Sequence, residues 1–243
     1  MTLFLLAHLF TDFIFQTDEG VKNRYEAPLQ GNLRHLIHMF ILFTVFGVAY
    51  LFLIESPTQD TAVSVLIFIL LNGAAHFITD TLKVMATKRI SVDSVWLLLA
   101  DQALHVLVIY GTYKMLLHPY TISSVPLRYI HLLLFLGLAT FVSGVIIRHI
   151  LRYFHLTSKE TPSLRSADGT DSMNYGRWIG IIERSIMFLA LFFNLLGLLT
   201  VVIAFKTVSR YQKFKENSEY YIIGNLLSIL FVLVFYGLFR VMA

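Results

Sequence analysis

Residues 33–54 read LRHLIHMFILFTVFGVAYLFLI, a continuous apolar run whose first positions include Arg34, His35 and His38. A run of roughly 20 apolar residues is long enough to cross the hydrocarbon core of a bilayer as an α-helix. Because the apolar residues are continuous and do not alternate with polar ones, the pattern favours a helix over a strand of a transmembrane barrel. This stretch therefore predicts a membrane-spanning helix that carries ionisable side chains in its first turns.

Apolar runs of the same kind recur along the whole chain. They cover residues 2–16, 33–54, 62–86, 94–117, 128–150, 178–205 and 219–242. The composition agrees, because 57% of the residues are hydrophobic and 14% are charged, whereas a soluble domain has about 45–50% apolar and about 25% charged residues. We predict an all-α fold, a polytopic transmembrane helix bundle of about seven segments with the lipid bilayer as its partner.

The stretch from residue 157 to residue 176 is rich in Ser, Thr, Asp and Gly and predicts a flexible polar linker. It divides the chain into a five-segment N-terminal bundle, residues 1–156, and a two-segment C-terminal region, residues 177–243. Basic residues concentrate in the loops at 17–34, 83–93 and 148–177, which the positive-inside rule places in the cytoplasm. Seven spans then put the N-terminus outside the cell (inner) membrane and the C-terminus in the cytoplasm. The basic loop at 206–218 contradicts this count, which places it outside.

The chain contains no cysteine, so disulfides and thiolate metal ligands are ruled out. Its formal net charge of +4 is modest, and the basic residues are spread over the loops. This distribution fits membrane topology and anionic headgroups better than nucleic acid. We therefore expect no nucleic-acid partner and leave an oligomer open.

The first four apolar segments carry polar residues, most of them ionisable, at spacings of three and four, which place them on one helical face. The sets are His8, Asp12 and Gln16; His35 and His38; His76, Asp80 and Lys83; and Asp101 and His105. A charge at the centre of a bilayer costs about 2.5–3.5 kcal/mol on insertion scales, so these groups need partners. In the predicted topology all of them fall in the cytoplasmic half of the bilayer. This common depth indicates one shared site.

Histidine and carboxylate side chains together suit zinc, manganese, iron or nickel. We predict one or two divalent metal ions, with zinc as the first choice and manganese or iron as alternatives. The predicted metal ligands are His8, Asp12, His35, His38, His76, Asp80, Asp101 and His105, and the predicted catalytic residues are Asp12, Asp80, Lys83 and Asp101. The alternative is that each polar residue is a hydrogen-bond partner between helices, and that Lys83 is an interface anchor.

A second polar group belongs to the C-terminal segments. Arg177, Glu183 and Arg184 lie at the start of the sixth segment, and Lys206 and Arg210 lie at its end. Because a guanidinium matches the geometry of phosphate, an anionic or phosphorylated small molecule or lipid is the expected ligand. The predicted substrate-binding residues are Gln16, Arg177, Arg184, Lys206 and Arg210. Headgroup anchoring and structural ion pairs are the alternative.

These motifs together resemble a bacterial integral-membrane family known as domain of unknown function 3307. The resemblance rests on HLFTDFIFQ (8–16), HLIH (35–38), HFITDTLK (76–83) and DQALH (101–105), and extends to GRWIGIIER (176–184), AFKTVSR (204–210) and EYYIIGNLLS (219–228). The family name supplies no activity. More loosely, the pairs of His and Asp four residues apart are similar to those of membrane-bound metal-dependent hydrolases.

The leading prediction is a membrane-embedded metal-dependent hydrolase that acts on a phosphorylated or lipid-linked substrate. A metal would lower the pKa of a bound water towards about 7 and polarise the scissile group. An Asp or His that is not a metal ligand would move protons, and Lys83, Arg177 and Arg184 would stabilise developing negative charge. The alternatives are a transporter for divalent metal or protons and a non-catalytic metal-binding membrane sensor or partner.

Overall fold

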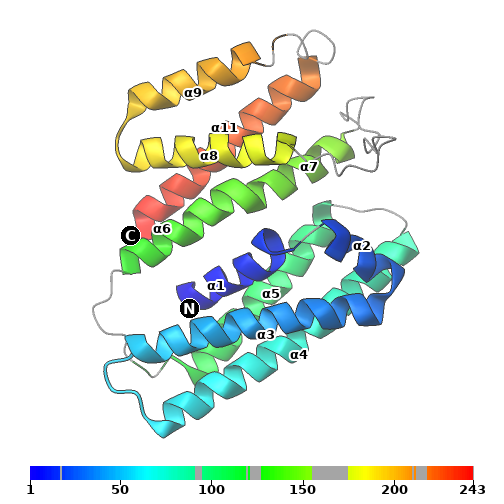
Figure 1. Cartoon of the computed structure of the whole chain (residues 1–243), viewed down its shortest axis with the longest axis vertical. Helices are drawn as coiled ribbons and strands as arrows, with labels where there is room; N and C mark the ends of the chain where they lie inside the picture. The colour runs from blue at the N-terminus through cyan, green and yellow to red at the C-terminus, as the bar shows by residue number, and fades with distance from the viewer. Residues whose placement is uncertain are drawn as a thin grey trace. The chain divides into compact units, whose positions relative to one another are not determined.

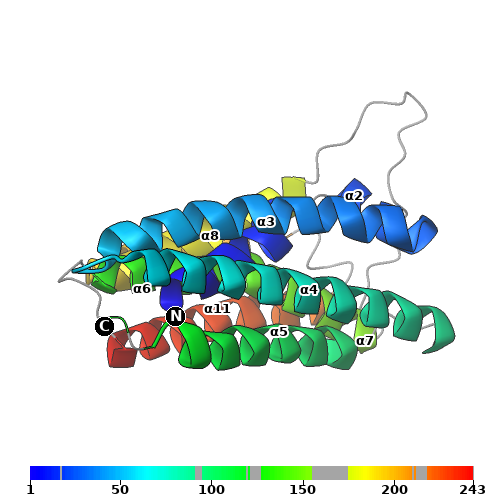
Figure 2. The same cartoon turned by 90° about the horizontal axis from the view of Figure 1, so that it is seen from below.

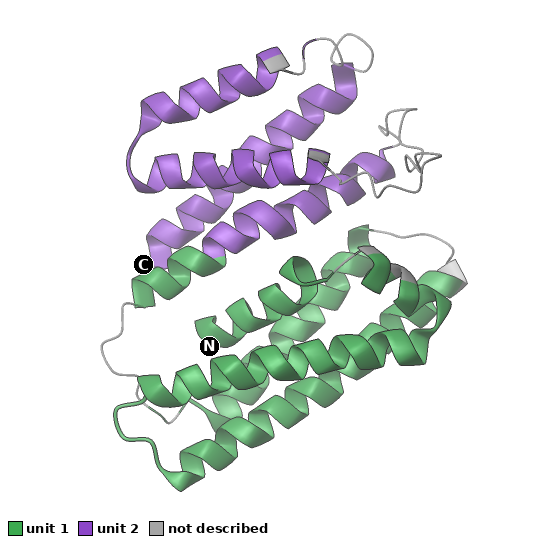
Figure 3. Ribbon diagram, viewed as in Figure 1, with its two compact units in different colours: residues 1–134 green, residues 135–243 purple. Residues whose placement is uncertain are grey.

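The computed structural model describes residues 1–16, 18–90, 95–118, 120, 127–154, 175–209, 211 and 218–242. These residues form helices joined by short connections, and no β-strand occurs among them. The chain forms two compact units, unit 1 (residues 1–134) and unit 2 (residues 135–243), which Figure 3 shows in different colours. The predicted all-α class is confirmed.

Unit 1 is built on three long antiparallel helices that pack side by side, α3 on α4 and α4 on α5 (Figures 1 and 2). The short helix α1 packs against α3 and α5, and the polar helix α2 packs against α3. The elements are α1 (Thr2–Leu9), the π-helical turn η1 (Phe10–Ile14), α2 (Asp18–Glu26), α3 (Pro28–Leu53), α4 (Gln59–Ile90), α5 (Val95–Leu116) and the start of α6 (Leu127–Gly137).

Local sequence fixes where the long helices of unit 1 begin. Helix α3 starts at Pro28, and proline is favoured at the first helical position because the amide it lacks would have no intrahelical partner. Helix α4 is preceded by Thr58, whose Oγ1 accepts from the Thr61 amide at 3.3 Å, while the Thr58 amide donates to Thr61 Oγ1 at 3.1 Å. This reciprocal pair satisfies two amides at the helix start, as a capping box does.

Unit 2 continues the helix that α6 begins. Its elements are the π-helical turn η2 (Leu138–Val142), α7 (Ser143–Tyr153), α8 (Tyr175–Phe192), α9 (Leu196–Ser209) and α11 (Ser218–Met242). Helices α7 and α8 and the turn η2 pack together and against α11. The fifth apolar segment therefore groups mainly with the C-terminal helices, whereas the sequence grouped it with the first four. The linker predicted at 157–176 lies outside the described residues, except for residues 175 and 176.

Among the described residues, five helices are long and apolar enough to cross a membrane: Pro28–Leu53, Gln59–Lys88, Val95–Leu116, Leu127–Tyr153 and Ser218–Met242. The segments Thr2–Ile14 and Leu196–Val208 are apolar but shorter. Large apolar side chains such as Ile41, Phe52 and Leu107 are exposed on the outer faces of the long helices, as expected where lipid is the solvent. The structure thus supports a membrane-embedded bundle, with about seven segments as an approximate count.

The prediction of one span over residues 178–205 is wrong, because the chain turns at Asn194. Asn194 adopts φ 58°, a left-handed conformation that asparagine tolerates better than most residues. The Leu195 amide donates to the Ala190 carbonyl at 2.7 Å, and the Asn194 amide donates to Leu191 at 3.1 Å. This pair of bonds is the Schellman motif that ends a helix. Helices α8 and α9 consequently form an antiparallel hairpin (Figure 1).

The interior of unit 1 is divided into an apolar half and a polar half. Phe4, Phe43, Tyr50 and Phe68 fill the apolar half, with the rings of Phe4 and Phe68 4.4 Å apart. The Tyr50 hydroxyl donates to the Leu117 carbonyl at 3.1 Å, so this buried polar group is satisfied. Since α3, α4 and α5 are antiparallel, the start of α3, the second half of α4 and the start of α5 meet in the polar half.

Candidate metal centre

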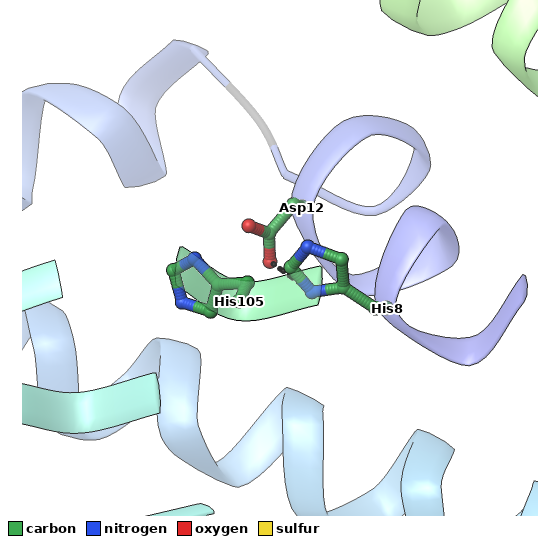
Figure 4. A group of neighbouring side chains, drawn as sticks. All are labelled: His8, Asp12 and His105. Atoms are coloured by element: carbon green, nitrogen blue, oxygen red, sulfur yellow. Dashed lines mark ion pairs between the residues drawn. The ribbon is translucent and has the colours of Figure 1, made fainter. Parts of the chain in front are cut away.

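Side chains from four helical segments converge in the polar half of unit 1. Six of them supply three overlapping groups, and within each group the potential ligand atoms lie within 4.8 Å of one another. The groups are His8, Asp12 and His105; Asp12, His35 and His76; and His76, Asp80 and His105. Figure 4 shows the first group, with a dashed line between the His8 ring and the Asp12 carboxylate and the His105 ring beside them. None of the six side chains is more than 7% exposed.

Asp12 lies at the centre of this cluster. It belongs to η1, a π-helical turn of a kind often found at functional sites. Its Oδ1 atom lies 3.2 Å from His35 Nε2, 3.4 Å from His76 Nε2 and 3.8 Å from His8 Nδ1. One carboxylate oxygen therefore faces imidazole nitrogens from three different segments.

Gln102 of α5 determines which nitrogen of His8 carries the proton. Its Nε2 donates to Asp12 Oδ2 at 3.3 Å and to Asp101 Oδ2 at 3.1 Å, and both carboxylates can only accept. Gln102 Oε1 must then accept from His8 Nε2, 3.1 Å away. In a neutral His8 this leaves a lone pair on Nδ1, a buried atom with no hydrogen-bond partner, facing Asp12 Oδ1. Two acceptors face each other across 3.8 Å, an arrangement that a cation between them would stabilise.

His105 also presents a lone pair to the cluster. Its Nδ1 atom lies 2.8 Å from the carbonyl oxygen of Asp101, so in a neutral ring Nδ1 donates and Nε2 is the acceptor. The Nε2 atom lies 2.8 Å from the Thr79 hydroxyl and 3.9 Å from Asp80 Oδ1. Metal-ligating histidines usually donate their second ring N–H to a carbonyl or carboxylate in this way.

His76 is surrounded by the other members of the cluster. The centroid of its ring lies 4.3 Å from that of His105 and 5.1 Å from that of His35. Its Nε2 atom is buried without a hydrogen-bond partner, although Asp12 Oδ1 lies at 3.4 Å and Asp80 Oδ2 at 3.6 Å. A buried polar atom left unsatisfied costs about 1–3 kcal/mol. Coordination to a divalent ion would remove this cost for His76, and an ion in the group of His8 would remove it for His8 Nδ1.

Two cations hold the acidic residues on the outer side of the cluster. Arg24 Nη1 of α2 donates to Asp80 Oδ2 at 2.8 Å, and Lys83 Nζ donates to Asp101 Oδ2 at 2.8 Å. Asp101 belongs to none of the three ligand groups, and its Oδ2 atom accepts from both Lys83 and Gln102. Its role as a metal ligand stays a prediction.

A family model described as protein of unknown function (DUF3307) matches residues 1–136. The chain belongs to the DUF3307 family. No curated protein and no solved structure matches the chain. The match covers unit 1 and with it the complete His/Asp cluster, so the cluster belongs to the part of the DUF3307 protein that defines its family. The motifs at 176–184, 204–210 and 219–228 lie beyond the match.

Two predicted site residues of the DUF3307 protein, His38 and Gln16, belong to none of the ligand groups and line a neighbouring cavity. His38 is exposed and belongs to none of the ligand groups. It is one helical turn beyond His35 and lines a cavity that Gln16, Arg24 and Arg34 also line. The role of His38 as a metal ligand stays a prediction.

Two of the predicted C-terminal substrate ligands, Arg184 and Lys206, are buried in unit 2 and make polar contacts there. Arg184 donates to the Thr140 carbonyl in η2 through Nε at 3.1 Å and Nη2 at 2.7 Å. Lys206 Nζ lies 2.9 Å from Glu183 Oε2 and donates to Ser228 Oγ at 3.2 Å. These contacts fit the alternative interpretation of the sequence, in which the C-terminal charged residues form structural ion pairs.

The remaining two predicted C-terminal ligands are Arg177 and Arg210. Arg177 lies in the first turn of α8 and is only partly exposed, while Arg210 lies outside the described residues. The role of both residues in substrate binding stays a prediction.

Sequence reasoning missed two members of the DUF3307 site, Gln102 and Arg24. Gln102 follows Asp101 directly, and a polar residue next to an intramembrane carboxylate is a signal that could have found it. Arg24 was counted only as a basic loop residue. Its contact with Asp80 depends on the packing of α2 on α3, which no local pattern encodes.

Proposed function

We propose that this DUF3307 protein is a membrane-embedded, metal-dependent hydrolase that acts on a phosphorylated or lipid-linked substrate. One observation carries the proposal: His8 Nδ1, with its proton position set by Gln102, presents a lone pair to Asp12 Oδ1 in a buried site. Opposed acceptors of this kind suit a cation. The imidazole and carboxylate donors suit zinc first, and manganese or iron as alternatives.

The three ligand groups share members in a way that supports two ions. Asp12 belongs to two groups, and His76 and His105 also belong to two each. A shared carboxylate can bridge a pair of metal ions, as in two-metal hydrolytic sites. Each group supplies three protein ligands, which leaves a coordination position for water, as in catalytic zinc sites.

The residues around the ligands have distinct roles in the proposed reaction. When bound, the ions supply an activated water and charge that stabilises the transition state. Arg24 and Lys83 carry positive charge at the edge of the cluster and would stabilise negative charge on the reacting group. Asp101 holds the Lys83 ammonium in place through its 2.8 Å contact. Gln102 keeps the His8 proton on Nε2.

The apolar half of unit 1 argues against the transporter alternative. A conducting path needs polar groups or water through the whole bundle. Beyond the cluster, Phe4, Phe43 and Phe68 are each no more than 1% exposed and fill the interior. Asn72 and Thr112 are polar there, but the Asn72 side chain donates to Thr112 Oγ1 at 2.9 Å and to the Phe68 carbonyl at 2.8 Å. Among the described residues, this half of the interior is thus packed mainly with aromatic side chains, which does not favour a conducting path.

We also infer an orientation in which both termini lie outside the cell membrane. The α8–α9 hairpin returns the chain, so the end of α9 lies at the same end of unit 2 as the start of α8. Lys206 then shares that end with Arg152 and Arg177, and the basic stretch at 206–218 follows the positive-inside rule. In this proposed orientation the basic stretch at 206–218 no longer conflicts with the positive-inside rule, because residues 178–205 are not one span.

The test is hydrolysis by the full-length protein in nanodiscs, with a soluble phosphomonoester and a lipid phosphate offered separately. We expect turnover that a chelator removes, that zinc or manganese restores, and that Asp12→Asn abolishes. Asp60→Asn, an exposed carboxylate at the start of α4, is the matched control and should keep full activity. Stoichiometric metal without turnover on either substrate would favour the sensor alternative, and metal uptake into proteoliposomes would favour the transporter.

A further inference from the structure

A cavity of about 250 Å³ lies next to the His/Asp cluster in unit 1. The side chains that line it include Gln16, Glu19, Arg24, Arg34, His35 and His38. Arg24 and His35 belong to both features, because Arg24 binds Asp80 and His35 binds Asp12. A molecule in this cavity would therefore contact residues that touch the predicted metal ligands.

The charges around this cavity are mainly positive. Arg24 and Arg34 carry permanent charge, His35 and His38 add two imidazoles, and Glu19 is the one acidic residue among the named lining. A guanidinium has five N–H donors, and the contact of Arg24 with Asp80 involves Nη1. Arg24 can thus keep Asp80 and present further donors to an anion. Arginine is the side chain best shaped to bind phosphoryl oxygens.

Helix α2 forms one wall of the cavity and is held close to α3 by Gly31. A Cβ atom at Gly31 would lie 2.6 Å from Arg24 Cα and 2.7 Å from Arg24 N. These are backbone atoms, so any larger residue must move α2. The absence of a side chain at Gly31 is therefore what lets Arg24 reach Asp80.

We propose that this cavity binds the phosphoryl group of the substrate, with Arg24, Arg34 and His38 as its anion ligands. That the bound phosphoryl group belongs to a substrate rests on the proposed hydrolase function. That the cavity binds phosphate does not rest on it. Helix α2 is polar and begins directly after the apolar α1–η1 segment, so the cavity is at the polar end of the bundle. The phosphoryl group of a soluble ester or of a lipid headgroup has the same chemistry at this position.

Binding of inorganic phosphate to the full-length protein, measured by equilibrium dialysis, tests the pocket without any turnover. Arg34→Gln should weaken binding about fivefold, the size expected for an exposed ion pair. His38→Gln should weaken it as well, whereas Glu19→Gln should not, because it removes a repelling charge. Lys88→Gln removes an exposed cation outside the cavity and should leave binding unchanged. Gly31→Ala should weaken phosphate binding while metal content stays.

Two further arms separate the sources of the phosphoryl group. Nanodiscs that contain phosphatidic acid should compete with inorganic phosphate if the headgroup enters the pocket, and nanodiscs of phosphatidylcholine alone should not. Competition between phosphatidic acid and inorganic phosphate would indicate a lipid substrate. A lack of competition would indicate a soluble substrate. The pocket proposal would be overturned if the wild type bound no phosphate. It would also be overturned if Arg34→Gln, His38→Gln and Gly31→Ala each bound phosphate as tightly as the wild type, even if hydrolysis is found. Phosphate binding with the expected pattern but no metal would overturn the hydrolase and leave the pocket.

Discussion

At the residue scale, the site depends on one amide side chain that joins three acidic or imidazole groups. Gln102 contacts His8, Asp12 and Asp101 at 3.1–3.3 Å. The sequence predicted that these three side chains share a depth, because their spacings of three and four repeat on successive segments. It could not predict the proton position on His8, which depends on a contact between residues 94 positions apart.

Replacing Gln102 should therefore weaken metal binding without removing a ligand. In Gln102→Leu the His8 proton is no longer held on Nε2, so we expect metal affinity to fall about 10–100-fold, as for other outer partners of metal ligands. Competition with a chromogenic chelator measures this. Thr112→Val, which alters an α4–α5 contact in the apolar half, is the control. Equal affinities for both variants would contradict the role of Gln102.

The Lys83–Asp101 ion pair should show strong coupling. Lys83→Met leaves the buried Asp101 carboxylate without its cation, and removal of one partner from a buried pair costs about 3–5 kcal/mol. Because Lys83 is 20% exposed, we expect less than this. The double variant with Asp101→Asn should recover part of the lost stability, measured by thermal unfolding in detergent. Additive losses in the double variant would show that the two side chains act independently.

At the element scale, the structure departs from the sequence prediction where an apolar run hides a turn. Residues 192–196 read FFNLL, and hydropathy does not distinguish them from a span. Asn194 is the only local signal, because a left-handed conformation favours glycine or asparagine. The polar helix α2 was read as a loop for a related reason, since it has few apolar residues and is held by packing on α3.

Substitutions at Asn194 should separate backbone strain from side-chain chemistry. Asn194→Gly keeps access to a positive φ, so the melting temperature should stay close to that of the wild type. Asn194→Val forces a β-branched residue into the left-handed region at a cost of roughly 1–2 kcal/mol, and the melting temperature should fall. If both variants melt alike, the α8–α9 turn does not rest on this conformation.

At the scale of the whole molecule, composition and run length were enough to predict a helical membrane protein. The division into units was less accessible, because helix α6–η2–α7 is continuous and its partners α8 and α11 come later in the chain. The family match ends at residue 136, close to the end of unit 1 at residue 134. The site is thus contained in one unit, and unit 2 adds its own buried network around Arg184 and Lys206.

The α8–α9 hairpin predicts the side on which the C-terminus lies. A reporter that is active only outside the cytoplasm should be active when fused after Ala243, and inactive when fused after Ser209. A reporter that is active only in the cytoplasm should give the opposite pattern. Extracytoplasmic activity after Ser209 together with cytoplasmic activity after Ala243 would mean that residues 175–209 cross the membrane once, as the sequence alone predicts.

The most direct test of the metal centre is the metal content of the purified full-length protein. The site predicts one or two divalent ions per chain in the wild type, and their loss in Asp12→Asn, which removes the carboxylate shared by two ligand groups. Asp60→Asn should retain the wild-type content. Wild-type protein that is free of metal after preparation with zinc, manganese or iron, or an Asp12→Asn variant that binds as much as the wild type, would contradict the account.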